Sequence, residues 1–156
     1  MNRGKAYLET RVLSADPVEL IAISYEFATL RVHEARRALA KGEIAERCTA
    51  ISKAIAIVGE LESSLNYEEG GEIAYNLGRL YRYMRDLLTQ ANLQREDKPL
   101  AEVQSLLETL ADAWLAISNG SHKAAEASPV DEVPQEWGTF AFQEFGAVHS
   151  EQGWSA

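Results

Sequence analysis

Apolar residues recur at intervals of three and four along the chain as far as Ile117, with charged and polar residues between them. This spacing places the apolar side chains on one face of an α-helix. Four windows with this pattern follow one another and begin near Asp16, Glu43, Gly71 and Asp97. Alternating patterns of the kind that form strands are nearly absent over the same region. The chain is therefore predicted to be all-α.

Signals for helix ends divide these windows. The first opens with "DPVE", in which Asp16 is an expected N-cap and Pro17 the first helical residue, and it ends near Gly42. The second window is predicted to stop around Asn66. The glycine pair at 70–71 is expected to end one helix and start the next, and the fourth window follows Asp97 to Ile117.

Short connections force consecutive helices to lie antiparallel. We therefore expect an up-down-up-down four-helix bundle over residues 16–117, preceded by a short N-terminal flap segment, 1–15. Residues 118–156 form an acidic C-terminal tail whose prolines predict partial disorder. The later part of the tail is rich in aromatic residues, so it is either disordered as well or a segment that docks on the bundle or on a partner. These residues are Trp137, Phe140, Phe142, Phe145 and Trp154.

The first predicted helix is apolar on two sides. Steps of about 100° per residue place one stripe, which includes Tyr25 and Val32, toward the core. A second set lies on roughly the opposite side: Leu20, Ile23, Phe27 and Leu30. A bundle helix needs one apolar stripe, and leaving such side chains exposed forgoes about 1.5–3 kcal/mol each. Either the N-terminal segment, with its apolar residues Tyr7, Leu8, Val12 and Leu13, covers this face permanently, or the cover is exchangeable for a partner's helix or peptide.

The formal net charge of −9 argues against nucleic acid as a partner, because phosphate binding depends on clusters of Lys and Arg. The nearest basic stripe, around Arg82, is interpreted as a solvated helix face with an Arg82–Asp86 ion pair. No apolar run is long enough to span a bilayer, and no signal peptide is recognisable, so membrane insertion is not expected. The single cysteine, Cys48, is read as a small buried residue, which suits a cytoplasmic protein.

Residues that carry chemistry are few. Of the three histidines, His122 and His149 lie in the tail, and no metal-binding spacing is present. We therefore expect no catalytic residue, no metal and no cofactor, and a protein that is not an enzyme. One alternative is a histidine phosphotransfer module that uses His33, although Arg37 stands where such modules usually have a glycine.

Three blocks of the sequence resemble the signature blocks of the flagellar secretion chaperone family, FliS. They are "AYLETRVLSADPVELIAISYEFA", "SSLNYEEGGEIAYNLGRLYRYM" and "ANLQREDKPLAEVQSLLETLADAW", in the family's order and spacing, from about Ala6 to Trp114. The glycine-containing block is the most specific of the three. Glu26 stands where the family often has Asp, and the tail extends beyond the usual bundle.

The resemblance implies a cytoplasmic export chaperone that binds the disordered C-terminal segment of flagellin. Such a chaperone prevents premature polymerisation and assists delivery to the flagellar export gate. The phase of the helices leads us to expect flagellin contacts from the N-terminal segment, from the second face of the first helix and from the rim of the third helix. These residues are Tyr7, Leu8, Leu20, Ile23, Phe27, Leu30, Tyr81 and Leu88.

Two alternatives stay open beside the chaperone. A regulatory or adaptor bundle that binds another flagellar or signalling protein through the same face differs only in its partner. The phosphotransfer module through His33 is the other. A further hypothesis is that residues 137–145 of the tail occupy a flagellin groove when the chaperone is empty.

Overall fold

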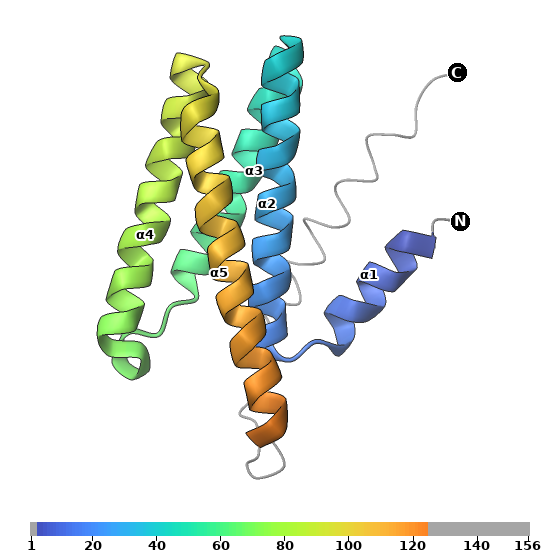
Figure 1. The fold of residues 1–156 in the computed structure, drawn as a ribbon, viewed down its shortest axis with the longest axis vertical. Helices are drawn as coiled ribbons and strands as arrows, with labels where there is room; N and C mark the ends of the chain where they lie inside the picture. Colours follow the sequence, from blue (N-terminus) through green and yellow to red (C-terminus); the bar gives the residue numbers. More distant parts are fainter. Residues whose placement is uncertain (1–2, 125–156) are drawn as a thin grey trace.

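The computed structural model describes residues 3–124, and those residues form helices joined by short loops (Figure 1). No strand occurs among them, so the all-α prediction is confirmed. The helices are α1 (Arg3–Ser14), α2 (Pro17–Lys41), α3 (Ile44–Ser63), α4 (Tyr67–Gln94) and α5 (Asp97–Ala124).

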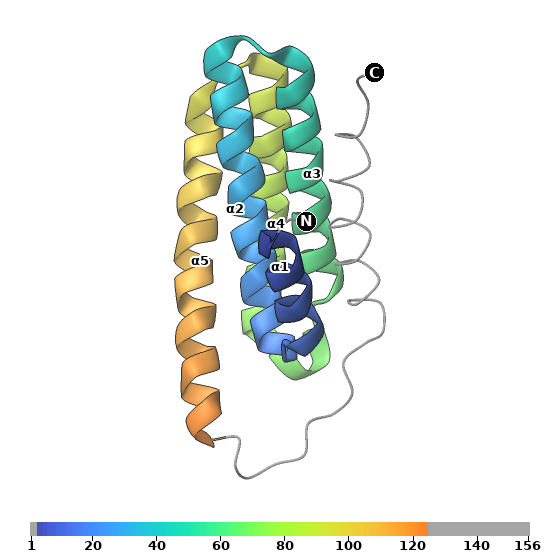
Figure 2. The same ribbon diagram turned by 90° about the vertical axis from the view of Figure 1, so that its right-hand side faces the viewer.

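Helices α2 to α5 run alternately up and down and form the predicted four-helix bundle (Figures 1 and 2). Each packs against two neighbours: α2 lies beside α3 and α5, and α4 lies beside the same two helices. The short helix α1 stands at an angle to the bundle, beside the N-terminal half of α2 (Figures 1 and 2). It therefore adds to one side of the bundle and does not extend its core.

The ends of α2 are those that the sequence predicts. The carboxylate of Asp16 accepts a hydrogen bond from the backbone N–H of Glu19 at 2.8 Å, and Pro17 opens the helix. At the other end Gly42 adopts a left-handed conformation with φ of 73°, and its N–H reaches carbonyl oxygens of the last turn. These local signals act without help from tertiary packing, which explains why the prediction is accurate here.

The junction between α3 and α4 follows the prediction at the glycine pair, where one helical segment ends and the next begins, but α3 ends earlier than predicted. Helix α3 already ends at Ser63, and the side chain of Asn66 caps a single turn that starts at Tyr67. Gly71, with φ of 48° and ψ of −127°, then bends the chain into the long part of α4. At Gly78, a Cβ atom would lie 2.8 Å from the hydroxyl of Tyr67, so this glycine lets the turn fold back against α4.

Helix α5 continues past Ile117 to Ala124, so the predicted end of this helix is wrong. Residues 118–124, which the sequence assigns to the tail, are the last turns of α5. The aromatic residues of the tail, and with them the hypothesis on residues 137–145, lie outside the described residues.

A buried aromatic layer joins three helices of the bundle. Tyr25 of α2 packs against Tyr81 of α4 and Trp114 of α5, with ring centroids 6.4 and 6.5 Å apart. The two tyrosine hydroxyls share a hydrogen bond, and burial raises the pKa of both phenols. Both hydroxyl groups therefore stay protonated and paired inside the bundle.

The prediction that Tyr81 and Leu88 lie on the rim of α4 is wrong. They are 2% and 0% exposed and belong to the core. The reason is that α4 contacts both α3 and α5, so that its buried face is wider than one apolar stripe. Ile73, which the same pattern places on the core stripe, is instead 73% exposed.

Ion pairs link neighbouring helices at the surface. Arg82 and Arg85 of α4 each bind Glu62 of α3 at 2.9 Å, so the predicted pairing of Arg82 with Asp86 is wrong. From the sequence, an ion-pair partner can be predicted only within the same helix. Glu62 becomes the partner of Arg82 and Arg85 because α4 packs beside α3.

A second surface pair joins the C-terminal part of α2 to the start of α5. The guanidinium of Arg36 donates two hydrogen bonds to the carboxylate of Asp97, at 2.7 and 2.8 Å. These bonds hold the pKa of Asp97 below its usual value.

The bend at Gly71 gives a test with a matched control. Gly71→Ala places a side chain in a backbone conformation that L-residues rarely adopt, at a cost of about 1–3 kcal/mol. Gly59→Ala, inside α3, also meets no atom within 4 Å but has a helical backbone, and it should stabilise by about 0.5–1 kcal/mol. Urea unfolding measures both, and effects of the same sign would contradict the assigned bend.

The Arg36–Asp97 pair predicts a pH dependence. Because the folded-state pKa of Asp97 is lowered, its contribution is present above the ordinary value of about 3.9 and is lost as the pH falls through the folded pKa. Asp97→Asn should therefore lower the free energy of unfolding at pH 7, by about 0.2–1 kcal/mol for such an exposed pair, and this effect should shrink as the pH falls through the lowered pKa of Asp97. Asp112→Asn, an exposed site on the same helix, is the control and should show a smaller pH-dependent effect.

Candidate binding site

Helix α1 turns one face toward the bundle and the other toward solvent. Arg11 and Val12 each lie about one turn beyond Leu8, and all three are half-buried. On the outer side Tyr7 is 68% exposed and Leu13 is 76% exposed. The N-terminal segment therefore lies beside part of α2, which is common to both expectations from the sequence. Only one face of α1 takes part in this contact.

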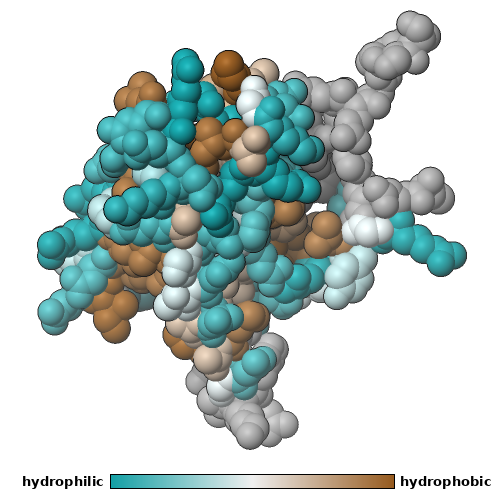
Figure 3. Space-filling model, turned by 45° about the horizontal axis from the view of Figure 1, so that its top comes forward, coloured by the Kyte–Doolittle hydropathy of each residue, from teal (hydrophilic) through white to brown (hydrophobic). Residues whose placement is uncertain are grey.

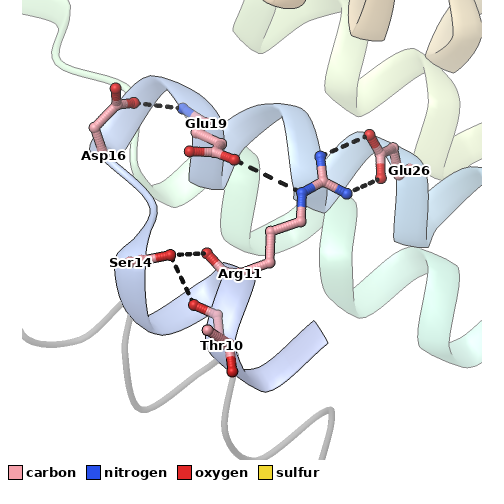
Figure 4. A network of polar contacts seen from close by, with 6 residues as sticks. All are labelled: Thr10, Arg11, Ser14, Asp16, Glu19 and Glu26. Carbon is pink, nitrogen blue, oxygen red and sulfur yellow. Dashed lines mark hydrogen bonds and ion pairs between the residues drawn. The ribbon is translucent and has the colours of Figure 1, made fainter. Parts of the chain in front are cut away.

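The side chain of Arg11 fastens α1 to α2 (Figure 4). Its Nε atom lies 3.6 Å from a carboxylate oxygen of Glu19, and its two terminal nitrogens donate to the oxygens of Glu26 at 3.0 and 3.2 Å. The hydrogen bond with Glu26 is the main cause of the raised pKa of Arg11, which keeps its positive charge. We call these three residues the Arg11 clamp.

The clamp lies across the second apolar face of α2. Glu19 and Glu26 stand two turns apart on one side of the helix, so a guanidinium that reaches both must pass over Ala22 and Ile23. Ala22 is 0% and Ile23 is 3% exposed, and both lie outside the central core cluster, as does the buried Leu20. The extra apolar surface that the sequence predicts on α2 thus exists, and it is buried at the α1 end.

The remaining two predicted residues of this face behave differently. Phe27 is half-buried and packs against the central core cluster, so its predicted place on the side away from the core is wrong. Its ring reaches the core because α2 is enclosed by both α3 and α5. Leu30 is 44% exposed. A substitution of Phe27 would consequently change core packing as well as binding. A substitution of the exposed Leu30 tests binding with less effect on the core.

Of the eight predicted contact residues, Leu8 is half-buried on the inner face of α1, Leu20 and Ile23 are buried on the N-terminal part of α2, and Tyr7 is exposed on the outer side of α1. Leu30 extends this surface toward the middle of α2, while Tyr81 and Leu88 are core residues. The sequence analysis missed the clamp. A signal was present, because two glutamates flank an apolar stripe at helical spacing and Arg11 precedes them in the short N-terminal helix.

Other chemistry is sparse in the described part of the chain. Residues 3–124 contain no group of three or more His, Cys, Asp or Glu side chains placed to hold a metal ion. No helix in that range combines the length and apolar character that a membrane crossing requires. His33 is half exposed, and its Nε2 atom lies 3.9 Å from a carboxylate oxygen of Glu108.

Apolar surface is divided into separate areas by charged side chains on the face that includes the α2–α3 loop (Figure 3). Ile44 and Leu93 are isolated exposed apolar residues near this end of the bundle, 55% and 78% exposed. Single exposed residues of this kind need no partner, in contrast to the continuous face beneath α1.

Comparison with known proteins gives the family. A profile of the family described as Flagellar protein FliS matches residues 1–121. The chain belongs to the FliS family. It is 41% identical over 119 residues to the flagellar secretion chaperone FliS of Salmonella typhimurium, a match that covers 73% of this chain and 88% of that protein.

Two further relatives extend the comparison. The flagellar secretion chaperone FliSB of Pseudomonas aeruginosa is 38% identical over 72% of this chain and 89% of its own length. The FliS protein of Campylobacter jejuni is 32% identical over 73% of this chain and 89% of its own length. The present FliS-family chain is thus a flagellar export chaperone, and the family is one of chaperones and not of enzymes.

The clamp predicts how α1 moves. Arg11→Gln removes three ion contacts and should increase amide hydrogen exchange along α1 several-fold, because few other contacts hold this helix. Exchange in the buried middle of α2 should not change. Arg36→Gln breaks a comparable pair elsewhere and is the control. Equal exchange in α1 for the two variants would show that Arg11 does not hold the helix.

Proposed function

We propose that this FliS-family protein acts in the cytoplasm, binds the disordered C-terminal segment of flagellin, prevents its premature polymerisation and assists its delivery to the export gate. The observation that carries the proposal is the Arg11 clamp, a surface ion pair that holds a short helix over buried apolar residues of α2. Membership of a flagellar chaperone family supports flagellin as the partner.

The cover that α1 provides is well suited to exchange. Partly exposed ion pairs contribute about 0.2–1 kcal/mol, and an isolated helix of 12 residues is marginally stable in water. Lifting α1 would expose Leu20 and Ile23, which costs about 1.5–3 kcal/mol for each side chain. Replacement of α1 by another apolar helix is therefore favoured over its simple loss.

A partner helix can also use more surface than α1 does. Toward its N-terminus α1 diverges from α2 (Figure 1), and Leu30, two turns beyond Ile23 on the same side of α2, remains exposed. A helix lying along α2 from Leu20 to Leu30 would bury this residue as well. A cation on that helix at the place of Arg11 would keep the two glutamates paired.

Binding in this way needs no nucleotide and no covalent step. Flagellin's C-terminal segment must lose conformational entropy when it becomes ordered, and apolar burial along α2 offsets that cost. Once covered, the segment cannot take part in self-assembly. The chaperone therefore acts in a fixed stoichiometry and releases its partner through competition at the same face.

Leu30→Asp tests the proposal through affinity for a synthetic C-terminal flagellin peptide, measured by calorimetry. The charge should weaken binding at least tenfold while leaving helical circular dichroism unchanged, because Leu30 is already 44% exposed. Ile44→Asp introduces the same charge at the far end of the bundle and should leave the affinity unaltered.

Arg11→Gln should tighten the same peptide several-fold, because a looser α1 competes less for the face. Equal affinities for the Leu30 and Ile44 variants would rule out α2 as the binding surface. Weaker binding for the Arg11 variant would show that α1 assists the peptide and does not compete with it.

A further inference from the structure

The two carboxylates of the Arg11 clamp form a cation site on the surface of α2. Glu19 and Glu26 are separated by about two turns of this helix, so their side chains leave it on the same side. Figure 4 shows both carboxylates turned toward the guanidinium of Arg11, which lies between them. The cation of this site therefore comes from a different helix than the two acids.

The geometry of the site matches a guanidinium more closely than a simple positive charge. The two terminal nitrogens of Arg11 each donate to one oxygen of Glu26, at 3.0 and 3.2 Å, and Nε points to Glu19 at 3.6 Å. Such a fork addresses two carboxylates at once because its donors lie in one plane at fixed directions. A lysine offers one ammonium group and cannot reproduce this arrangement.

Apolar contacts surround the cation on both helices. On α1, Leu8 and Val12 lie on the same face as Arg11 and are half-buried. On α2, Ala22 and Ile23 are buried beneath the clamp. A segment that takes the place of α1 must therefore combine apolar side chains with a positive charge on one face.

The overall charge of the chain favours the same kind of segment. Helix α1 carries Arg3, Lys5 and Arg11, with Glu9 as its one acidic residue, whereas the whole chain has a formal net charge of −9. A basic helix is thus bound to an acidic protein. Another basic segment would keep this electrostatic complementarity, and an acidic one would be repelled.

We propose that Glu19 and Glu26 select an arginine in the flagellin segment that replaces α1. The selection rests on the proposed function and adds to it the side chain that is recognised. Helix α1 then occupies the face as an internal copy of the ligand, and its residues Leu8, Arg11 and Val12 give the pattern. In a helix that runs as α1 does, the arginine has large apolar residues three positions before it and one position after it.

The arginine matters more for a long occupant than it does for α1. With α1 in place, the side chains of Glu19 and Glu26 are still 34% and 42% exposed. A helix that covers α2 from Leu20 to Leu30 would remove more water from both carboxylates. A carboxylate that loses water without gaining a partner raises the free energy of the complex, so an apolar segment without a cation is disfavoured.

The test measures by calorimetry how far one arginine of the ligand depends on Glu26. The chaperone is the full chain with Arg11→Gln, so that α1 no longer uses the two carboxylates. The probe is the synthetic C-terminal flagellin peptide, with each arginine changed in turn to glutamine. One of these changes should weaken binding several-fold. This loss should disappear when Glu26→Gln is added to the chaperone, and it should persist with Glu46→Gln, a matched change at an exposed glutamate of α3.

Lysine at the same peptide position should recover only part of the lost affinity. Full recovery would show that a simple positive charge is enough and would overturn the selection of arginine. A loss that is independent of Glu26, or that Glu46→Gln cancels equally well, would also overturn it, while binding of the unmodified peptide would still support the proposed function. Failure of the unmodified peptide to bind would overturn both proposals.

Discussion

Helix α2 must bury apolar side chains on two sides, and this constraint organises the molecule. Tyr25 and Val32 face the bundle and are completely buried, while Leu20 and Ile23 are buried outside the central cluster. Steps of about 100° along a helix do not allow both sets to face the same neighbours. Helices α3 and α5 pack on one side of α2, and Arg11 holds the short helix α1 beside its N-terminal half. A binding protein can form its site in this way, because displacing α1 costs less free energy than displacing a helix of the bundle.

The two ends of the bundle differ in how completely their apolar side chains are buried. The clamp attaches to the N-terminal part of α2, and at the same end, where α4 begins and α5 ends (Figure 1), Ile73 and Ile117 are exposed. At the other end Leu100 and Val103 are fully buried, and Arg36 pairs with Asp97 nearby. A gradient from tight to open packing confines local opening to one end, so that exchange of a cover there need not unfold the protein.

Polar contacts between helices fix positions more than they add stability. The pairs of Glu62 with Arg82 and Arg85 are partly exposed, as is the pairing of Arg11 with Glu26. Such pairs contribute little free energy but have defined geometry, so they set which turn of one helix lies beside which turn of the next. The Tyr25–Tyr81 hydrogen bond is different, since it is buried and fixes α4 against α2 from the inside.

The sequence by itself determined the features that depend on local interactions. The cap at Asp16, the stop at Gly42 and the apolar periodicity each involve residues within a few positions, and together they predicted the bundle and the surplus face of α2. Only the tertiary structure decided which residues of each stripe are buried, because that depends on where the helices converge. Tyr81 lies at the point of convergence and is buried, whereas Ile73, on the same helix, lies where α4 and α5 have separated and is exposed.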